Sequence, residues 1–283
     1  MDGFSGYNQI QVALKDQDKT TFTCPWGTYA YQVLPFGLCN APATFQRVVL
    51  GIFSDLIHDS VEVYMDDFIA YGNTFEEALE TLEKVLKICK EANLSLSHEN
   101  CFMMFTEGIV LGHHISRDGI KVDNSKVEVI SKLSIPSCQK DVRSFLGFIG
   151  YYRRFIENFT KIASPLFKLL TKYCEFNWNP NCQFAFETLK EKNSEAPILR
   201  GPNWKLPFHI STDASDTTLG VVLGQKDLIP YVIYYTSKNL APTKLNYIVT
   251  EKEFLAVVHA INKFKHYTTG YETFVHTDHS TIR

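Results

Sequence analysis

Two adjacent aspartates, Asp66 and Asp67, are the residues of this chain whose types and spacing point most directly to chemistry. They lie between two strand-like runs, 61–65 and 68–71, without the glycine or asparagine that a tight hairpin usually prefers. Two neighbouring carboxylates repel each other, and a divalent cation relieves that repulsion because Mg²⁺ favours carboxylate oxygens. The pattern therefore indicates a metal-binding hairpin, although a hairpin whose aspartates merely face water has the same pattern.

Three further acidic residues lie at the ends of predicted elements. Asp213 and Asp278 each follow a predicted strand, and Glu253 lies near the start of a predicted helix. Each of these positions also suits an ordinary structural role. Thr250 and Glu253 form a capping-box pattern, so the glutamate could simply satisfy a helix N-terminus, and the aspartates could be turn formers.

Turn chemistry and changes in periodicity divide the chain into three regions, 1–115, 116–200 and 201–283. The first mixes strands with helices, the second is largely helical, and the third returns to strands followed by a helix and another strand. The predicted strands are 29–34, 61–71, 208–212, 220–224, 231–236 and 273–277. Together the regions indicate a mixed α/β (α+β) fold.

Three helices have recognisable N-terminal signals or periodicity. One begins at Thr74, with Glu77 completing a capping box and apolar residues following at helical spacing, and another begins at the Asn179-Pro180 pair. A third covers 251–266. Pro197, Gly201 and Pro202 predict a connection between domains.

The charge distribution is more informative than the net charge of −3, which does not by itself indicate a nucleic-acid binder. Residues 126–172 contain nine Lys and Arg residues against three Asp and Glu residues. This segment is therefore the candidate phosphate-binding surface. Seven scattered cysteines, never in a C-x-x-C pair, argue against a disulfide framework and a structural zinc site.

Membrane and export signals are not apparent. No run approaches the roughly 20 consecutive apolar residues that a membrane span needs, and no basic-then-apolar signal peptide opens the chain. We expect a soluble intracellular protein, cytoplasmic or nuclear, that does not bind a membrane.

Three segments carry a resemblance to a known family. Residues 64–67 (YMDD) resemble the Y-x-D-D motif of reverse transcriptases, and 34–46 (LPFGLCNAPATFQ) resemble the nucleotide- and template-contacting motif of Ty3/gypsy retrotransposons. Residues 2–7 (DGFSGY) are similar to the segment that holds the first metal-binding aspartate. The chain thus resembles part of a Ty3/gypsy-type Pol polyprotein, with a truncated palm, a helical thumb or connection, and a truncated RNase H-like mixed-sheet domain.

The resemblance implies RNA-directed DNA polymerisation by two-metal nucleotidyl transfer. Asp2, Asp66 and Asp67 would hold two Mg²⁺ ions, with Mn²⁺ as an alternative. The implied substrate-binding residues are Tyr7, Pro35, Phe36, Gly37, Tyr64 and Met65. Tyr7 would stack under the incoming sugar and exclude a 2′-hydroxyl, although core tyrosines are common; Gly37 would let backbone approach the nucleotide, although it also suits an ordinary turn.

The implied nucleic-acid contacts lie in two segments. Residues 111–116 (LGHHIS) are similar to the family's primer-gripping hairpin, which assigns Gly112 and His113 to it. Residues 144–155 resemble the thumb signature, and their helical spacing predicts one shared face for Arg143, Gly147, Gly150 and Arg154. That face would track a primer–template duplex, or its glycines would pack against another helix. Asn100 departs from the family, which usually has a lysine there.

The third region resembles the retrotransposon RNase H domain, which makes Asp213, Glu253 and Asp278 its catalytic and metal-binding residues, again with two Mg²⁺ ions. The implied partners are an RNA/DNA primer–template, deoxynucleoside triphosphates, and a dimer partner or flanking Pol domains, within a virus-like particle or the nucleus. We expect the chain to be a fragment with little activity in isolation, because both metal sites lose supporting structure. Asp2 sits at a terminus expected to fray, and the RNase H-like region lacks the family's fourth acidic residue and final helix. The alternative function is an inactive remnant that only binds nucleic acid.

Overall fold

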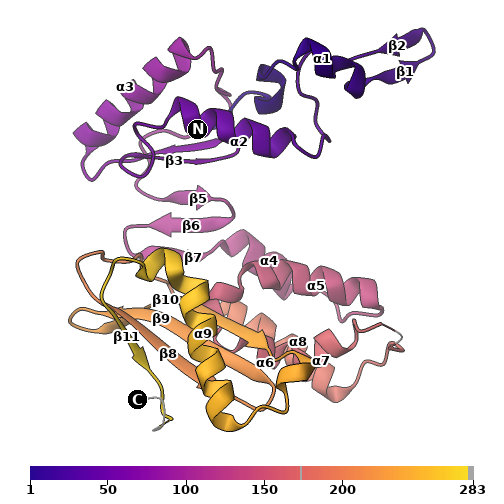
Figure 1. Cartoon of the computed structure of the whole chain (residues 1–283), viewed down its shortest axis with the longest axis vertical. Coiled ribbons are helices and arrows are strands. Elements are labelled where there is room, and N and C mark those ends of the chain that lie inside the picture. The colour runs from indigo at the N-terminus through magenta and orange to yellow at the C-terminus, as the bar shows by residue number, and fades with distance from the viewer. Residues whose placement is uncertain (173, 280–283) are drawn as a thin grey trace. The chain divides into compact units, whose positions relative to one another are not determined.

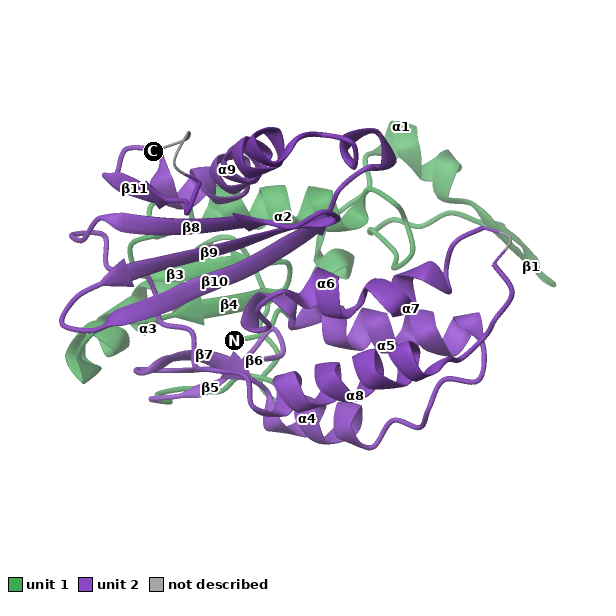
Figure 2. Ribbon diagram, turned by 90° about the horizontal axis from the view of Figure 1, so that it is seen from below, with its two compact units in different colours: residues 1–105 green, residues 106–283 purple. Residues whose placement is uncertain are grey.

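The chain folds in two parts, which Figure 2 shows in separate colours. The structure is a computed structural model that describes residues 1–172 and 174–279. Unit 1 comprises residues 1–105 and unit 2 comprises residues 106–283. Within the described residues, no helix combines the length and the apolar character needed to cross a membrane.

Unit 1 is built around a two-stranded antiparallel hairpin, β3–β4, with helices packed against it (Figure 1). Its elements in chain order are η1 (Gly6–Gln9), α1 (Leu14–Gln17), η2 (Asp18–Thr20), β1 (Phe22–Cys24), β2 (Gly27–Tyr29), α2 (Ala41–Ile52), β3 (Val61–Tyr64), β4 (Asp67–Ala70) and α3 (Phe75–Glu91). The fully buried side chains that join these elements include Phe45, Phe53, Val61, Phe68 and Val85.

The predicted start of helix α3 at Thr74 is confirmed, because Thr74 is its N-cap. The Thr74 hydroxyl oxygen accepts from the Glu77 N–H over 3.2 Å, and the Glu77 carboxylate accepts from the Asn73 N–H over 2.8 Å. The apolar residues at helical spacing in α3 are not all buried, because Leu79 and Leu86 are exposed. A single helix packed on a small hairpin has more apolar side chains than the hairpin can cover.

Unit 2 begins with a three-stranded antiparallel sheet and continues into helices. The sheet contains β5 (Gly108–Val110), β6 (His113–Ser116) and β7 (Gly119–Val122). The helices are α4 (Asn124–Ser131), α5 (Gln139–Tyr151), η3 (Arg153–Phe155), α6 (Phe159–Ile162), α7 (Ser164–Lys168) and α8 (Pro180–Ser194). The predicted start of α8 is confirmed, because the Asn179 side chain accepts from the Cys182 N–H over 3.0 Å.

The rest of unit 2 is a four-stranded sheet of order β10-β9-β8-β11 with helix α9 against one face (Figure 1). Its elements are β8 (Phe208–Ala214), β9 (Thr218–Lys226), β10 (Pro230–Asn239), η4 (Pro242–Lys244), α9 (Val249–Thr268) and β11 (Thr273–His276). β11 is parallel to β8, and the other pairs are antiparallel. The predicted order of strands, helix and strand is therefore confirmed.

One predicted strand differs in the structure. The predicted strand 29–34 is wrong: β2 ends at Tyr29, and only Val33 forms a further bridge, with Gln11. The connection between domains near Pro197 stays a prediction. Within unit 2, Leu199 in this segment exchanges backbone hydrogen bonds of 2.8 and 2.9 Å with Ile120.

Candidate active sites and nucleic-acid surface

The β3–β4 hairpin presents Asp66 and Asp67 at its turn. Met65, the preceding residue, has a φ of +55°. Residues other than glycine and asparagine seldom adopt this left-handed backbone conformation. Its N–H donates to Oε1 of Gln46 over 2.5 Å, and Nε2 of Gln46 donates to the Val63 carbonyl over 3.2 Å. Gln46 on α2 therefore stabilises a turn that lacks glycine. In the sequence, Gln46 was only the last residue of a longer motif.

Asp2 lies on a short extended segment that pairs with β4. The Gly3 N–H donates to the Asp66 carbonyl over 2.8 Å, and Asp2 forms an antiparallel bridge with Asp67. On the other side, the Ser97 N–H donates to the Asp2 carbonyl over 2.7 Å. The expectation that Asp2 frays is wrong, because its backbone is held on both sides. Three carboxylates therefore arise from adjoining backbone positions.

The surroundings of Asp67 favour its protonated form. Burial, and then the charges of Asp66 and Asp2, raise the pKa of Asp67 above its ordinary value. One oxygen of Asp2, Oδ2, accepts a hydrogen bond of 2.9 Å from the Asn100 side-chain amide. The residue that departs from the family pattern thus contacts the predicted metal ligand directly. Sequence reasoning identified the departure but not this contact.

The segment between Asp2 and η1 packs closely because it contains glycine. A Cβ added at Gly6 would lie 3.0 Å from the Phe45 ring and 3.4 Å from Cβ of Asp66. Tyr7 follows, and its ring meets Phe45 and Phe36 edge-on, with centroids 5.6 and 5.1 Å apart. Tyr7 is half-buried, so part of its ring packs on the core of unit 1 and part stays accessible.

The other predicted nucleotide-binding residues are largely accessible. Phe36 is 66% exposed and Tyr64 is 54% exposed, while Pro35 and Met65 are half-buried. Gly37 has a φ of +97°, which a residue with a side chain rarely adopts, so glycine is required by the backbone here. Exposed aromatic rings are suited to stacking on a sugar or base.

A second carboxylate group lies at one end of the four-stranded sheet. Asp213 is near the end of β8, and Asp278 follows the parallel strand β11. Glu253 on α9 is buried; its Oε1 accepts from the Ala214 N–H over 3.0 Å, and its Oε2 is buried without a hydrogen-bond partner. Burial, and then the charges of Asp278 and Asp213, raise the pKa of Glu253, against the Ala214 hydrogen bond that lowers it.

The capping alternative for Glu253 is wrong. Helix α9 begins at Val249, one residue before Thr250, and the Ile248 N–H donates to the Glu251 carboxylate over 3.1 Å. Glu251 therefore satisfies the helix N-terminus, which leaves Glu253 directed at the end of β8. Thr250 instead contacts His279, with 3.2 Å between its hydroxyl oxygen and Nε2 of the imidazole.

Metal binding at either carboxylate group requires side-chain adjustment. Within the part of the chain that the structure describes, no three Asp, Glu, His or Cys side chains are arranged to hold a metal ion. The donor sets nevertheless fit a hard cation, since both consist of carboxylates whose mutual repulsion a cation would relieve. The unpartnered buried oxygen of Glu253 is a further indication at the second group.

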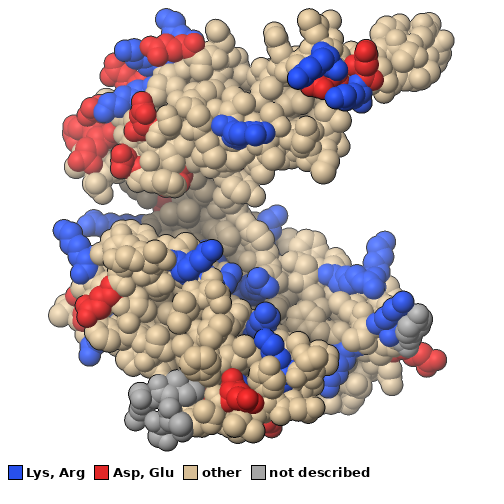
Figure 3. All heavy atoms as spheres, viewed as in Figure 1, with Lys and Arg blue, Asp and Glu red and all other residues tan. Residues whose placement is uncertain are grey.

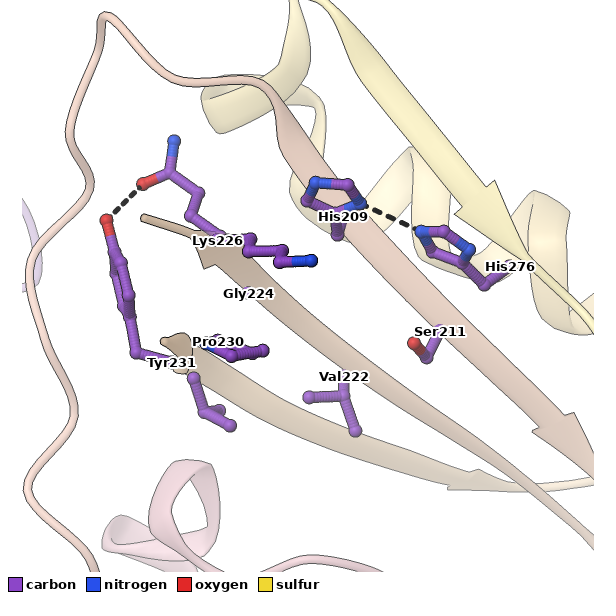
Figure 4. A pocket seen from close by; sticks show the side chains of 10 residues that line it. His209, Ser211, Val222, Gly224, Lys226, Pro230, Tyr231 and His276 are labelled. Carbon is purple, nitrogen blue, oxygen red and sulfur yellow. Dashed lines mark hydrogen bonds between the residues drawn. The ribbon is translucent and has the colours of Figure 1, made fainter. Parts of the chain in front are cut away.

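A histidine pair joins the parallel strands β8 and β11 (Figure 4). Nδ1 of His209 and Nε2 of His276 are 2.8 Å apart, so one imidazole donates and the other accepts. Burial, followed by His276 and Lys226, lowers the pKa of His209. The pair lines an open cavity of about 500 Å³. Because Asp278 follows His276 by two residues, this contact helps to fix the strand that leads to it.

Helix α5 exposes part of the predicted duplex-binding face. Arg143 and Gly147 are exposed, and no atom lies within 4 Å of a Cβ added at Gly147 or Gly150. The alternative prediction, that these glycines pack closely against another helix, is therefore wrong for the residues that the structure describes. Figure 3 shows several lysine and arginine side chains over unit 2, whereas acidic side chains gather over α3 in unit 1.

Arg154 does not share the face of Arg143. Helix α5 ends at Tyr151, and Arg154 lies in η3 with its guanidinium 4.7 Å from the Tyr234 ring centroid. Its Nε is buried without a hydrogen-bond partner. The sequence-based helix continued through the Tyr-Tyr pair, where the backbone in fact turns so that Phe155 enters the core.

The predicted primer-gripping residues lie at the β5–β6 turn. Gly112 has a φ of +68° and His113 begins β6. The His113 ring is half-buried, and burial lowers its pKa. Its neighbour His114 lies 3.8 Å from Glu107. Neither histidine belongs to a group of three metal-binding side chains within the described residues.

Two family models match the chain along most of its length. The model described as "Reverse transcriptase (RNA-dependent DNA polymerase)" matches residues 1–149, and that described as "RNase H-like domain found in reverse transcriptase" matches residues 178–275. The chain therefore belongs to the reverse transcriptase family, in which a polymerase part is followed by an RNase H-like domain.

The curated relatives are retrotransposon Pol polyproteins, which confirms the Ty3/gypsy-type resemblance. The chain is 37% identical over 285 residues to the Retrovirus-related Pol polyprotein from transposon 297 of Drosophila melanogaster. It is 32% identical over 286 residues to the Transposon Tf2-3 polyprotein of Schizosaccharomyces pombe. These alignments cover 100% of this chain but 26% and 22% of the relatives, so the chain spans about a quarter of their length.

Solved structures confirm the mixed α/β fold. The foamy viral protease-reverse transcriptase in complex with RNA/DNA hybrid matches with a TM-score of 0.87 and 25% identity, over 97% of this chain and 37% of that chain. The same protein in complex with dsDNA matches with a TM-score of 0.84, over 97% of this chain and 58% of that chain.

Proposed function

We propose that this chain is part of an RNA-directed DNA polymerase that copies RNA into DNA by two-metal nucleotidyl transfer. The observation that carries the proposal is the backbone pairing of Asp2 with Asp67, beside Asp66. Residues far apart in the sequence are thereby brought to one site. Carboxylates at one site suit the binding of two divalent cations.

Different residues of unit 1 would bind the metal ions and the nucleotide in the polymerase site. Asp2 and Asp66 would hold Mg²⁺, or Mn²⁺ in its place, with Asp67 supporting them; the ions would neutralise the triphosphate and favour loss of the primer hydroxyl proton. Tyr7 and Phe36 flank the incoming sugar, and the Tyr7 ring excludes a 2′-hydroxyl. The φ of +97° at Gly37 requires glycine, so no side chain separates the backbone there from the nucleotide.

The RNase H-like site is proposed to hydrolyse the RNA strand of the hybrid product. Asp213, Glu253 and Asp278 would hold the cations that supply the attacking hydroxide. The Ala214 N–H orients one Glu253 oxygen, which leaves the buried second oxygen for a cation. Burial keeps this carboxylate away from competing water.

The substrates and partners follow from this assignment. Deoxynucleoside triphosphates and an RNA/DNA primer–template are the proposed substrates. Arg143, Gly147 and Gly150 would lie along the duplex, and the turn that contains Gly112 and His113 would contact the primer. Two solved relatives are complexes with RNA/DNA hybrid and dsDNA, which supports a duplex ligand. We further propose flanking Pol domains or a dimer partner, and an intracellular site of action.

The test is primer extension on an RNA template by the 283-residue chain, with Mg²⁺ varied. Any extension by the isolated chain should require Mg²⁺ and should fall more than about 100-fold in Asp66→Asn, since loss of even outer metal contacts costs about 10–100-fold. Asp59→Asn, an exposed turn aspartate, is the matched control. A Glu253→Gln variant should lose hydrolysis of the RNA strand and keep extension.

The same assay addresses the alternative of an inactive remnant. Duplex binding without extension at any Mg²⁺ or Mn²⁺ concentration would exclude polymerisation by this chain and favour the remnant. Extension that persists in Asp66→Asn would contradict the assignment of the carboxylates.

A further inference from the structure

Two tyrosines at the end of α5 bind the backbone of the β5–β6 turn. The Tyr152 hydroxyl donates to the Gly112 carbonyl over 2.8 Å, and the Tyr151 hydroxyl donates to the Leu111 carbonyl. Leu111 and Gly112 both have left-handed backbones, with φ of 46° and 68°. The turn is strained at Leu111, so contacts from outside the hairpin are needed to hold it.

Aromatic packing reinforces these hydrogen bonds. The His113 ring lies 5.1 Å from the Tyr151 centroid, 5.6 Å from Tyr152 and 5.7 Å from Phe155. A Cβ added at Gly112 would lie 3.5 Å from the Tyr151 ring, so this ring covers one side of the turn. The turn therefore rests on α5 through side chains as well as backbone.

The hydrogen bonds also change the charge that the turn presents. The Leu111 carbonyl is within hydrogen-bond distance of both the Tyr151 hydroxyl and Nδ1 of His113, the latter at 3.0 Å. A carbonyl oxygen has two lone pairs, so both are occupied when Nδ1 carries the proton. With the Gly112 carbonyl also bonded, the turn has its acceptors satisfied and repels a phosphate less.

The far side of the same sheet is fixed to the helical part as well. Ile120 on β7 exchanges two backbone hydrogen bonds with Leu199. A Cβ added at Gly119 would lie 2.3 Å from the Leu199 carbonyl oxygen, so only glycine permits this approach. The sheet and α5 accordingly belong to the same unit, which begins at Thr106.

We propose that Tyr151 and Tyr152 are positioning residues for the primer terminus. They fix the Leu111-Gly112 turn to the end of α5, so that the duplex-binding helix and the turn act on the primer strand as one rigid surface. The inference rests on the proposed function, in which this turn contacts the primer. It adds that the hydroxyls of two thumb tyrosines determine where the primer 3′ end is held.

The experiment compares the 283-residue chain with its Tyr151→Phe, Tyr152→Phe and double variants. Phenylalanine retains the ring packing and removes only the hydroxyl. Tyr231→Phe is the matched control, because that hydroxyl also makes one hydrogen bond, of 2.9 Å to Gln225, away from the turn. Two readouts are independent of catalysis: amide hydrogen exchange of residues 108–116, and photo-cross-linking from a 4-thiothymidine at the primer 3′ end.

In the double variant, exchange at the turn should accelerate roughly tenfold or more, and cross-linking to the turn should fall at least about fivefold. Duplex affinity should change by less than about twofold, because the phosphate contacts of α5 remain. The control should resemble the wild type in both readouts.

Unchanged exchange and cross-linking in the double variant would overturn the inference. A wild-type chain that binds duplex but gives no cross-link at the turn would also overturn it, and the proposed metal-dependent polymerase would still stand. A chain that binds no duplex in any form would contradict the proposed function itself.

Discussion

Gln46 and Met65 are joined by the hydrogen bond that holds the aspartate turn in place, with 2.5 Å between Oε1 and the backbone nitrogen. Met65 has a left-handed backbone, which costs an L-residue roughly 1–2 kcal/mol. The second hydrogen bond of Gln46, to the Val63 carbonyl, holds the strand that leads into the turn. The Gln46 side-chain amide therefore stabilises a left-handed turn residue, a conformation for which an ordinary hairpin uses glycine or asparagine.

We predict that Gln46→Ala destabilises unit 1 and weakens the metal site. Two backbone groups lose their partners, so the free energy of unfolding should fall by about 1–3 kcal/mol. Urea denaturation measures this loss, and primer extension should fall with it because Asp66 follows Met65 directly. Gln17→Ala is the control, since it removes a 3.2 Å hydrogen bond to the Val12 carbonyl outside the turn. Equal stability losses in both variants would contradict the prediction.

We predict that Asn100 tunes the affinity of the polymerase site for Mg²⁺. Its amide donates to Oδ2 of Asp2 over 2.9 Å and so orients that carboxylate. Asn100→Ala should weaken Mg²⁺ binding by about 10–100-fold, the usual cost of removing a group that orients a ligand. Mg²⁺ titration of primer extension measures the change, with Asn262→Ala as a control that loses one amide hydrogen bond on α9. Unchanged Mg²⁺ dependence in Asn100→Ala would refute this role.

The sequence predicted those features that local patterns determine. The β3–β4 hairpin and the start of α3 follow from residues within a few positions of one another, and both are confirmed. The pairing of Asp2 depends on contacts with residues more than 60 positions away, so local patterns could not indicate it, and only the family resemblance implied that Asp2 joins Asp66 and Asp67. For the same reason Gln46 was found within a motif without its role as the partner of the turn.

Helix ends were a second source of error. The spacing from Arg143 to Arg154 assumed one continuous helix, whereas burial of Tyr152 and Phe155 turns the chain after α5. At α9, Thr250 and Glu253 matched a capping box, but the N-cap is Ile248, two residues earlier, which gives the third helical position to Glu251. Tertiary packing decided both cases.

We predict that the metal-free chain loses stability as the pH rises through the raised pKa of Asp67. Burial, then Asp66 and Asp2, raise that pKa above the ordinary value of 3.8. A carboxyl group whose pKa is higher in the folded state stabilises fully below its unfolded pKa and loses that contribution above its folded one. Unfolding curves between about pH 4 and 7 should therefore show a smaller decline for Asp67→Asn than for the wild type.

Metal binding should reverse this penalty. At a free Mg²⁺ concentration of about 100 times Kd, the wild type should gain about 2.7 kcal/mol of stability at pH 7. The Asp67→Asn variant should gain less, because a supporting carboxylate is missing. Identical Mg²⁺ stabilisation in the two proteins would exclude Asp67 from the site.

We predict that Arg143 and Arg154 contribute to different properties. Arg143 is exposed on α5, so Arg143→Ala should weaken duplex binding and lower the salt slope by about 0.9, the value for one B-DNA phosphate. The Arg154 guanidinium lies 4.7 Å from the Tyr234 ring centroid, so Arg154→Ala should instead lower the free energy of unfolding by about 1–2 kcal/mol. Fluorescence anisotropy across salt concentrations and urea denaturation separate the two effects. An equal loss of salt slope in both variants would show that Arg154 leaves Tyr234 to bind phosphate.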